Sequence, residues 1–267
     1  MSLQISRTRS IGPRRLSTVL SERTLRMPRR TSSAFPDASQ YNFWIKLAPS
    51  VARLFGASSM LRTKTINAAQ IADFVDWQLR VFGSRPTVFA RREMLWERLA
   101  QRLDPNRPLV VLEFGVAWGY ATNWWLCRLG GRDVVWHGFD RFTGLPRAWR
   151  DYPQGTFDAG GKPPAIDDER VRWHVGDVQD TLGAVDLPAA RDAQWLVLFD
   201  MDIYEPTVSA WEVINAYLRP GDVIYLDEAV DRDERRVLDE MILPSIGCES
   251  VGATPYALGL VVTHPVA

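Results

Sequence analysis

Four acidic residues follow two apolar segments of the sequence, each with the composition of a buried strand. The run WLVLF is followed directly by Asp200, with Asp202 two positions later. The run VIYL is followed directly by Asp227 and Glu228. An isolated buried charge is costly, so acids in such places usually have a partner. If both segments are parallel strands, their carboxyl ends lie on one rim of the sheet, where a cation is expected to neutralise them. Oxygen ligands alone favour Mg²⁺, so the sequence predicts a magnesium site that includes Asp200.

Each of these acids also has a purely structural interpretation. Asp202 precedes the segment EPTVSAWEVI, and an acid at the beginning of a helix is favoured by the helix dipole. Asp227 and Glu228 would serve equally well in a solvated loop. The charge run DRDERRVLDE that follows them is typical of a solvated helix face.

The segment VVLEFGVAWGYATNWWL predicts a strand, a turn that contains Gly115 and Gly119, and a helix. In a doubly wound sheet, this first turn is where a nucleotide-like ligand binds. The turn lacks the middle glycine with which dinucleotide-binding loops approach a pyrophosphate, because Ala117 stands there. Glu113, just before the turn, suits a cationic ligand better than a diphosphate. Asp140 ends the next predicted strand and can accept hydrogen bonds from ribose hydroxyls.

These features favour S-adenosylmethionine (SAM), which has an amine, a sulfonium and a ribose but no phosphate. The segment HVGDVQDTL brings Gly176, Asp177 and Val178 to the expected position of the adenine ring, although Asp177 could equally cap a helix. The glycines could serve only close packing, and a nicotinamide cofactor is the competing ligand. The residues expected to contact SAM are Glu113, Phe114, Gly115, Val116, Gly119, Asp140, Arg141, Phe142, Gly176, Asp177, Val178 and Asp200.

Six segments occur in the order seen in bacterial class I SAM-dependent methyltransferases: VLEFGVAWG, FDRFTGLPRAWR, GTFDAGGKPP, VRWHVGDVQDTL, FDMDIYEPT and GDVIYLDEA. More narrowly, the chain resembles the macrocin-type, metal-dependent O-methyltransferases, from about residue 109 to about residue 263. The resemblance implies that Asp200, Asp227 and Glu228 are metal ligands and that Asp202 is the catalytic base. Some relatives use a histidine three positions after the first acid, but this chain has Ile203 there.

The expected activity is therefore SAM-dependent O-methylation, assisted by Mg²⁺, of a hydroxyl on a small molecule such as a sugar or a glycosylated natural product. A bound metal would lower the pKa of the acceptor hydroxyl, and Asp202 would take its proton. Two alternatives stay open. The acids could act without a metal, or the chain could bind SAM without catalysing methyl transfer.

Strands and helices alternate from Pro108 onward, as in a doubly wound α/β fold. The predicted strands are 109–114, 134–139, 171–175, 195–199, 222–226, 248–253 and 257–263, and the predicted helices between them are 120–129, 207–218 and 233–243. Only the tripeptide TPY separates the last two strands, which is too short for a parallel crossover. The expected sheet is thus seven-stranded and mostly parallel, with an antiparallel last strand.

Three segments are expected: a flexible basic tail over 1–40, a helical extension over 41–107 and the SAM-binding domain over 108–267. Two helices are predicted in the extension, one within 66–83 and one within 87–103. The apolar stretch 41–61 suggests a homo-oligomer.

Hydrophobic residues make up 46% and charged residues 24% of the chain, as in a globular protein. The tail is rich in Arg and resembles an organellar transit peptide, but a cytoplasmic location is expected. The rest of the chain is net acidic, which argues against a nucleic-acid partner. No apolar run is long enough to predict a membrane span.

Overall fold

The computed structural model describes residues 59–187, 193–230 and 232–265. The predicted tail over 1–40, the beginning of the predicted extension and nearly all of the apolar stretch 41–61 lie outside the described residues. No helix in the described ranges is both long and apolar enough to cross a membrane.

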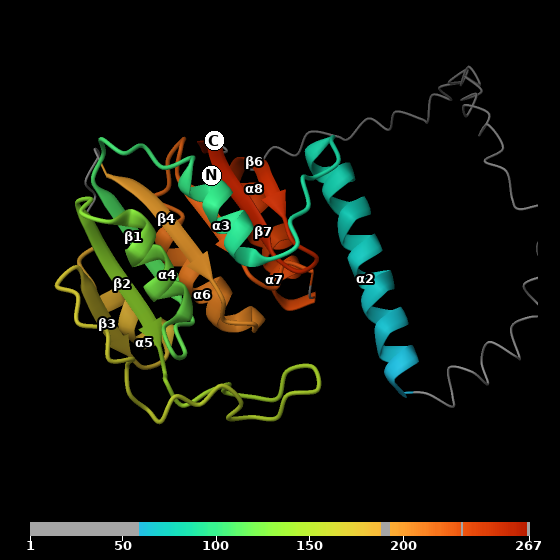
Figure 1. Cartoon of the computed structure of the whole chain (residues 1–267), viewed down its shortest axis with the longest axis horizontal. Helices are drawn as coiled ribbons and strands as arrows, with labels where there is room; N and C mark the ends of the chain where they lie inside the picture. Colours follow the sequence, from blue (N-terminus) through green and yellow to red (C-terminus); the bar gives the residue numbers. More distant parts are fainter. Residues whose placement is uncertain (1–58, 188–192, 231, 266–267) are drawn as a thin grey trace, which may run out of the picture. The chain divides into compact units, whose positions relative to one another are not determined.

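The described residues form one seven-stranded sheet in the order β3-β2-β1-β4-β5-β7-β6 (Figure 1). The first five strands are parallel, whereas β7 runs antiparallel to both of its neighbours. The predicted fold class, including the closing hairpin, is confirmed. The strands are β1 Leu109–Phe114, β2 Val134–Asp140, β3 Val171–Val175, β4 Gln194–Phe199, β5 Val223–Leu226, β6 Ile246–Ala253 and β7 Leu258–Pro265.

The helices lie before the sheet and between its strands. They are α2 Ser59–Phe82, α3 Arg92–Ala100, α4 Tyr120–Leu129, α5 Val178–Thr181, α6 Tyr204–Ile214, α7 Arg232–Val237 and α8 Leu243–Ser245, with a 3₁₀ turn η1 Leu182–Ala184 and a π-helical turn η2 Leu238–Ile242. Both helices predicted in the extension are present as α2 and α3. The single helix predicted over 233–243 is instead divided among α7, η2 and the start of α8.

Helices cover both faces of the sheet. Leu109 and Val111 of β1 belong to a buried cluster that also contains residues of α3 and α4, such as Trp96. Val110 and Leu112 face the opposite way and pack with residues of α2, α5, α6, α7 and η2. Successive side chains of a strand point to opposite faces, so a strand covered on both sides reads as a continuous apolar run.

The carboxyl ends of the central strands are level with one another. Phe114 at the end of β1 pairs with Phe139 of β2 and with Phe199 of β4, and its ring stacks on both at centroid distances of 5.0 and 5.4 Å. The turn after β1 then passes against the backbone of Asp200. Gly115 has a φ of +87°, and a Cβ atom there would lie 1.8 Å from the Asp200 carbonyl oxygen. Glycine is therefore required at this position, which joins β1 to the acidic end of β4.

Candidate active site

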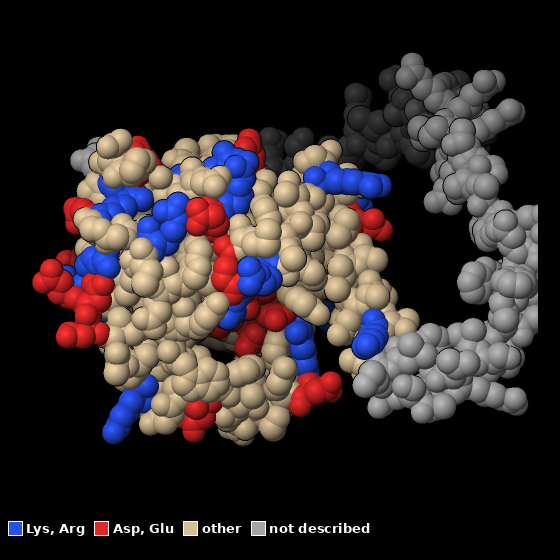
Figure 2. All heavy atoms as spheres, in the orientation of Figure 1, with Lys and Arg blue, Asp and Glu red and all other residues tan. Residues whose placement is uncertain are grey.

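A cavity of about 790 Å³ opens at this rim, where the chain leaves β1, β2, β3, β4 and β5. Its volume lies within the range of ordinary small-molecule sites, and this edge of a doubly wound sheet is the usual place for a ligand. In Figure 2, acidic side chains gather in a hollow of the surface and basic side chains stand at its edge. The predicted residues that line the cavity are Gly115, Val116, Asp140, Arg141, Gly176, Asp177, Val178, Asp200, Asp202, Asp227 and Glu228.

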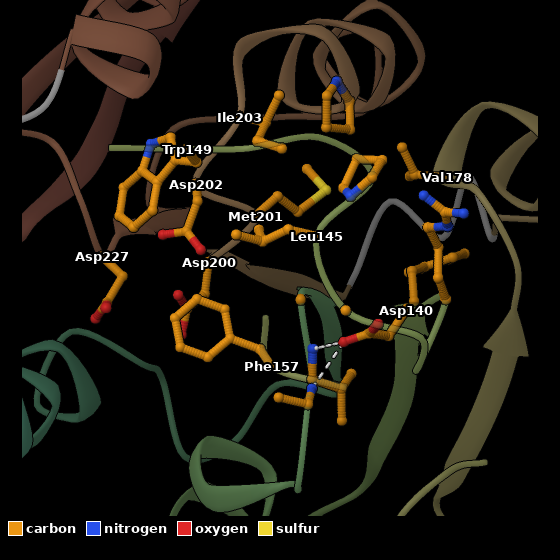
Figure 3. Close-up of a pocket in the computed structure, with 18 of the residues that line it drawn as sticks. Asp140, Leu145, Trp149, Phe157, Val178, Asp200, Met201, Asp202, Ile203 and Asp227 are labelled. Carbon is orange, nitrogen blue, oxygen red and sulfur yellow. Dashed lines mark hydrogen bonds between the residues drawn. The ribbon is translucent and has the colours of Figure 1, made fainter. Parts of the chain in front are cut away.

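The cavity has two ends in the close-up view. Figure 3 shows Asp140 and Val178 on one side and Trp149 and Asp227 on the other, with Met201 between them. Five described residues other than glycine have a positive φ, and those that line the cavity are Ala117, Arg150, Phe157 and Asp202. Strained backbone of this kind costs on the order of 1–3 kcal/mol per residue and is concentrated at functional sites.

Asp140 holds the glycine-containing turn in place. Its Oδ2 accepts hydrogen bonds from the backbone N–H groups of Val116 and Ala117 at 2.8 and 2.7 Å, and its Oδ1 accepts one from Phe142 N–H at 2.7 Å. In dinucleotide-binding folds, the N–H groups of this turn bind the pyrophosphate. Here a carboxylate already occupies two of them, so the turn suits a ligand without phosphate.

Asp177 and Arg141 form an ion pair at the same end of the cavity. Arg141 Nε lies 2.9 Å from Asp177 Oδ1, and both side chains are 38% exposed. Asp177 stands at the N-cap position of α5, but its side chain makes no capping hydrogen bond. The predicted adenine contact and the ion pair therefore involve the same carboxylate.

Four of the predicted SAM contacts do not line the cavity: Glu113, Phe114, Gly119 and Phe142. Phe114 and Phe142 are fully buried in the protein core. Gly119 precedes α4 with a φ of +75°, and a Cβ atom there would lie 2.8 Å from the Pro164 side chain. Glycine is required here because of this close packing, which is the alternative to a ligand contact that the sequence left open for the glycines.

Glu113 points away from the cavity because it lies on the α4 face of β1, in register with Leu109 and Val111. Its Oε2 accepts hydrogen bonds from Thr122 Oγ1–H at 2.6 Å and from Trp136 Nε1–H at 3.0 Å. Its Oε1 has no hydrogen-bond partner among the described residues. Burial raises the pKa of Glu113 to about 8. The cationic-ligand role predicted for this side chain is not what the geometry shows.

The substitution Glu113→Gln is expected to change how stability depends on pH. The folded state holds the Glu113 proton up to about pH 8, whereas the unfolded chain releases it near its ordinary pKa, about 4.3. Between these values the folded state binds more protons, so wild-type stability falls as pH rises, by on the order of 2–4 kcal/mol. Gln cannot ionise and should lack this loss. Urea unfolding at several pH values tests it, with Glu97→Gln, an exposed carboxylate paired with Arg128, as control.

Two of the predicted metal ligands converge on an arginine. Nη1 of Arg92, the first residue of α3, lies 3.3 Å from both Asp227 carboxylate oxygens and 3.6 Å from Asp200 Oδ2. The third, Glu228, accepts a hydrogen bond from Arg150 Nη2 at 2.9 Å. Sequence reasoning missed Arg92, which stands outside the segment that carries the family resemblance.

Carboxylates crowd this part of the site. Desolvation raises the pKa of Asp200 well above its ordinary value, and Asp227 and Asp202 act in the same direction, whereas Arg92 opposes them. Asp202 is 8% exposed and has a φ of +64°. It therefore places an acidic group in a backbone conformation that most residues avoid.

Glu234 belongs to the same acidic cluster, although the sequence predicts it on a solvated helix face. That expectation is wrong for Glu234, which is fully buried and accepts a hydrogen bond from Glu228 N–H at 2.9 Å. Burial raises its pKa well above the ordinary value, with Asp202 as the next cause. Nothing in the charge run distinguishes this residue from its exposed neighbours.

These residues, as they stand, do not fit a Mg²⁺ ion held by Asp200, Asp227 and Glu228. A Mg²⁺ ion needs its oxygen ligands at about 2.0–2.1 Å, whereas a guanidinium group already lies at the point where Asp200 and Asp227 meet. The described part of the chain contains no group of three or more His, Cys, Asp or Glu side chains placed to hold a metal ion. The magnesium site stays a prediction from the sequence.

Four aromatic side chains contact one another in a row along the cavity, and one of them, Trp118, belongs to the glycine-containing turn. The Trp149 and Tyr152 rings stack at 5.7 Å, Tyr152 contacts Phe157 at 5.3 Å, and Phe157 meets Trp118 edge-on at 6.5 Å. All four residues line the cavity. The loop after β2 supplies three of them, Trp149, Tyr152 and Phe157. Aromatic rings that line a cavity can stack on a sugar or an aromatic ring.

No protein-family model matches the sequence, and no curated protein matches it either. Among solved structures, CalS11, described as a calicheamicin methyltransferase, is 21% identical, with a TM-score of 0.52 over 71% of this chain and 91% of that chain. The O-methyltransferase NovP is 18% identical, with a TM-score of 0.46 over 63% and 79% of the two chains. A putative rRNA-methylase from Clostridium thermocellum is 14% identical, with a TM-score of 0.42 over 67% and 100%.

Identities this low establish a fold and leave the substrate open. The likeness to CalS11, the strand order and the antiparallel β7 agree with one another. The chain therefore has the fold of the class I SAM-dependent methyltransferases.

Proposed function

We propose that this chain transfers a methyl group from SAM to a hydroxyl of a small molecule, such as a sugar or a glycosylated natural product. The observation that carries the proposal is the two-ended cavity at the carboxyl rim of the sheet. The Asp140 end suits a phosphate-free nucleoside, and the aromatic end suits an acceptor ring. Asp202 lies at the acceptor end, beside Trp149 (Figure 3).

The cofactor end favours SAM over a dinucleotide. The Val116 and Ala117 N–H groups are bound to Asp140 and are not available to a pyrophosphate. The carboxylates of Asp140, Asp177 and Asp200 line the cavity. A ligand with an amine and ribose hydroxyls supplies hydrogen-bond donors to these acceptors, whereas a diphosphate is itself an acceptor and would find few donors in the glycine-containing turn.

The proposed mechanism assigns one task to each part of the site. The Asp140 end of the cavity would hold SAM, which would supply an electrophilic methyl group for the acceptor oxygen, with S-adenosylhomocysteine as the leaving group. The aromatic wall of Trp149, Tyr152 and Phe157 orients the acceptor, and such positioning is worth about 7–11 kcal/mol of the barrier. Asp202 takes the hydroxyl proton, which contributes about 10²–10⁴-fold.

Calorimetric titration with S-adenosylhomocysteine tests the cofactor without an acceptor. We expect one site per chain with a dissociation constant of about 1–100 μM, equivalent to about −8 to −5.5 kcal/mol. NAD⁺ is the control ligand and should not bind. Failure to bind S-adenosylhomocysteine, or tighter binding of NAD⁺, would remove the basis of the proposal.

The acceptor is identified by incubating the chain with SAM that carries a radiolabelled methyl group. A panel of hydroxylated glycosides and phenols is expected to contain labelled product, whereas single-stranded and structured RNA should stay unlabelled. Label in RNA alone would overturn the small-molecule acceptor. Tight cofactor binding without transfer to any acceptor would favour the catalytically silent alternative. The cytoplasmic location and the homo-oligomer stay predictions from the sequence.

A further inference from the structure

One arginine joins the acidic ends of two strands. Arg92 Nη1 lies within 3.6 Å of Asp200 at the end of β4 and within 3.3 Å of Asp227 at the end of β5. Asp227 is held in addition by the hydroxyl of the buried Tyr225, which donates to its Oδ1. The guanidinium thus occupies the point at which a cation would contact both carboxylates.

The position of Arg92 is set by tertiary contacts and not by its helix. Arg92 is the first residue of α3, where the helix dipole disfavours a positive charge. Its guanidinium carbon lies 5.2 Å from the ring centroid of Trp96 and 5.1 Å from that of Tyr120. Burial alone would lower the pKa of Arg92, but Asp227 and Asp200 outweigh it, so its pKa is raised. Two rings and two carboxylates therefore hold a charge that the local structure does not favour.

A dication and this guanidinium compete for the same oxygens. Two unit charges about 4 Å apart interact by about 4 kcal/mol in partly buried surroundings, attractively if opposite and repulsively if alike. A cation already bound to the carboxylates therefore neutralises them and repels a second cation. The other acid predicted to be a ligand, Glu228, is already paired with Arg150. Arg92 by itself places a positive charge between Asp200 and Asp227, so a metal ion is not needed there.

We infer that Arg92 is the resident cation of Asp200 and Asp227, in the place that the sequence assigns to Mg²⁺, and that the native chain holds no dication there. The arginine fixes both carboxylates at the floor of the cavity and acts as a positioning residue. Without Arg92, the negative charges of Asp200 and Asp227 would have no cation between them. Their carboxylate oxygens are ligands of the kind that Mg²⁺ prefers. Removing Arg92 is therefore expected to create a metal site.

The test is calorimetric titration of Mg²⁺ into the full chain, with and without S-adenosylhomocysteine. Wild type and Arg92→Lys, which keeps the charge, should show no saturable binding. Arg92→Gln should bind one Mg²⁺ saturably, with an affinity at least about tenfold above the weakest that the titration of the wild type could detect, a difference of about 1.4 kcal/mol. A merely structural role for Arg92 would not produce this gain. Because Mg²⁺ alone is the titrant, failure of S-adenosylhomocysteine binding would end the proposed function and leave this inference untouched.

Two controls locate the gained site. Arg141→Gln removes a cavity arginine that is paired with the single carboxylate of Asp177, and it should gain nothing. The double variant Arg92→Gln/Asp227→Asn should lose the binding that Arg92→Gln gains. Thermal unfolding checks that each variant folds, and Arg92→Met, which keeps the apolar stem against Trp96, replaces Arg92→Gln if that variant does not.

Either of two results would overturn the inference. The first is saturable Mg²⁺ binding by the wild type that Asp227→Asn abolishes. The second is a folded Arg92→Gln, or its Arg92→Met replacement, that binds Mg²⁺ no better than the wild type does.

Discussion

Replacing Asp202 with Asn is expected to lower kcat for methyl transfer by about 10²–10⁴-fold, the usual contribution of a positioned base. The dissociation constant of S-adenosylhomocysteine should change by no more than about threefold, less than about 0.7 kcal/mol. Asn keeps the shape of the side chain but cannot accept a proton from the acceptor hydroxyl. Both values come from initial rates with the radiolabelled methyl donor and the acceptor found in the screen, together with calorimetry.

Asn is the appropriate substitution because of the backbone at this position. Asp202 has a φ of +64°, a conformation that Asn adopts at lower cost than Ala does. The matched control is Glu205→Gln, which removes another carboxylate from the cavity wall, one that is 69% exposed and paired with Arg147. Its kcat should stay within about threefold of wild type, since exposed ion pairs contribute little.

Two results would contradict the role of Asp202. An Asp202→Asn variant with wild-type kcat would mean that the proton leaves by another route, such as solvent. A loss of cofactor affinity as large as the loss of kcat would make Asp202 a ligand of SAM and not a base.

The central strand β1 could be predicted to the residue because it is buried along its whole length and reads as an apolar run with turn signals at each end. The edge strand β3, which contains no fully buried residue, also has the predicted bounds, and the short TPY connection fixes the direction of β7. The helix after β5 was harder to predict. Its sequence has one helical period, but the structure interrupts it with a π-helical turn at Leu238–Ile242, which local propensity does not encode.

Site residues at strand ends could be predicted, and those brought in from elsewhere could not. Asp140, Asp200 and Asp227 reach one rim because parallel strands end there, so topology alone brings them together. Arg92 comes from a helix that precedes the sheet, and nothing in the segment ARREM marks its second arginine as the one that turns inward. Glu234 is likewise one acid among many in its segment.

The predicted SAM contacts that do not line the cavity have a common physical reason. These predictions treated residues adjacent in sequence to the glycine turn as adjacent to the ligand. Alternation along the strand sends Glu113 to the α4 face, and close packing turns Phe142 into the core. Only residues whose backbone or side chain emerges at the rim, such as Gly115 and Asp140, line the cavity.

Asp140 has an observed structural role in addition to the ligand-binding role predicted from the sequence. It was predicted to bind the ribose, but its carboxylate also accepts hydrogen bonds from three backbone N–H groups of the turns after β1 and β2. A carboxylate oxygen has two lone pairs, so both roles can be filled together. The two roles make different predictions for a substitution that removes the carboxylate.

The substitution Asp140→Ala is expected to weaken S-adenosylhomocysteine binding by at least about 100-fold, or about 2.7 kcal/mol. It should also lower the free energy of unfolding of the ligand-free chain by about 2–4 kcal/mol, because three N–H groups lose a charged acceptor. Calorimetry and urea unfolding measure the two effects. Asp177→Ala, which removes a half-exposed carboxylate from the same end of the cavity, should cost less than about 1 kcal/mol of stability.

Comparing the two measurements separates the roles of Asp140. A loss of affinity with unchanged stability would mean that Asp140 acts only by contacting the ligand and that the turn holds its shape without it. A loss of both means that the turn is organised before the ligand arrives. In that case Asp140→Asn should fall between wild type and Asp140→Ala, because it keeps one acceptor oxygen but turns an N–H group toward a backbone donor. The Asp140 carboxylate would then bind a phosphate-free nucleoside and, at the same time, occupy the Val116 and Ala117 N–H groups that a diphosphate would need.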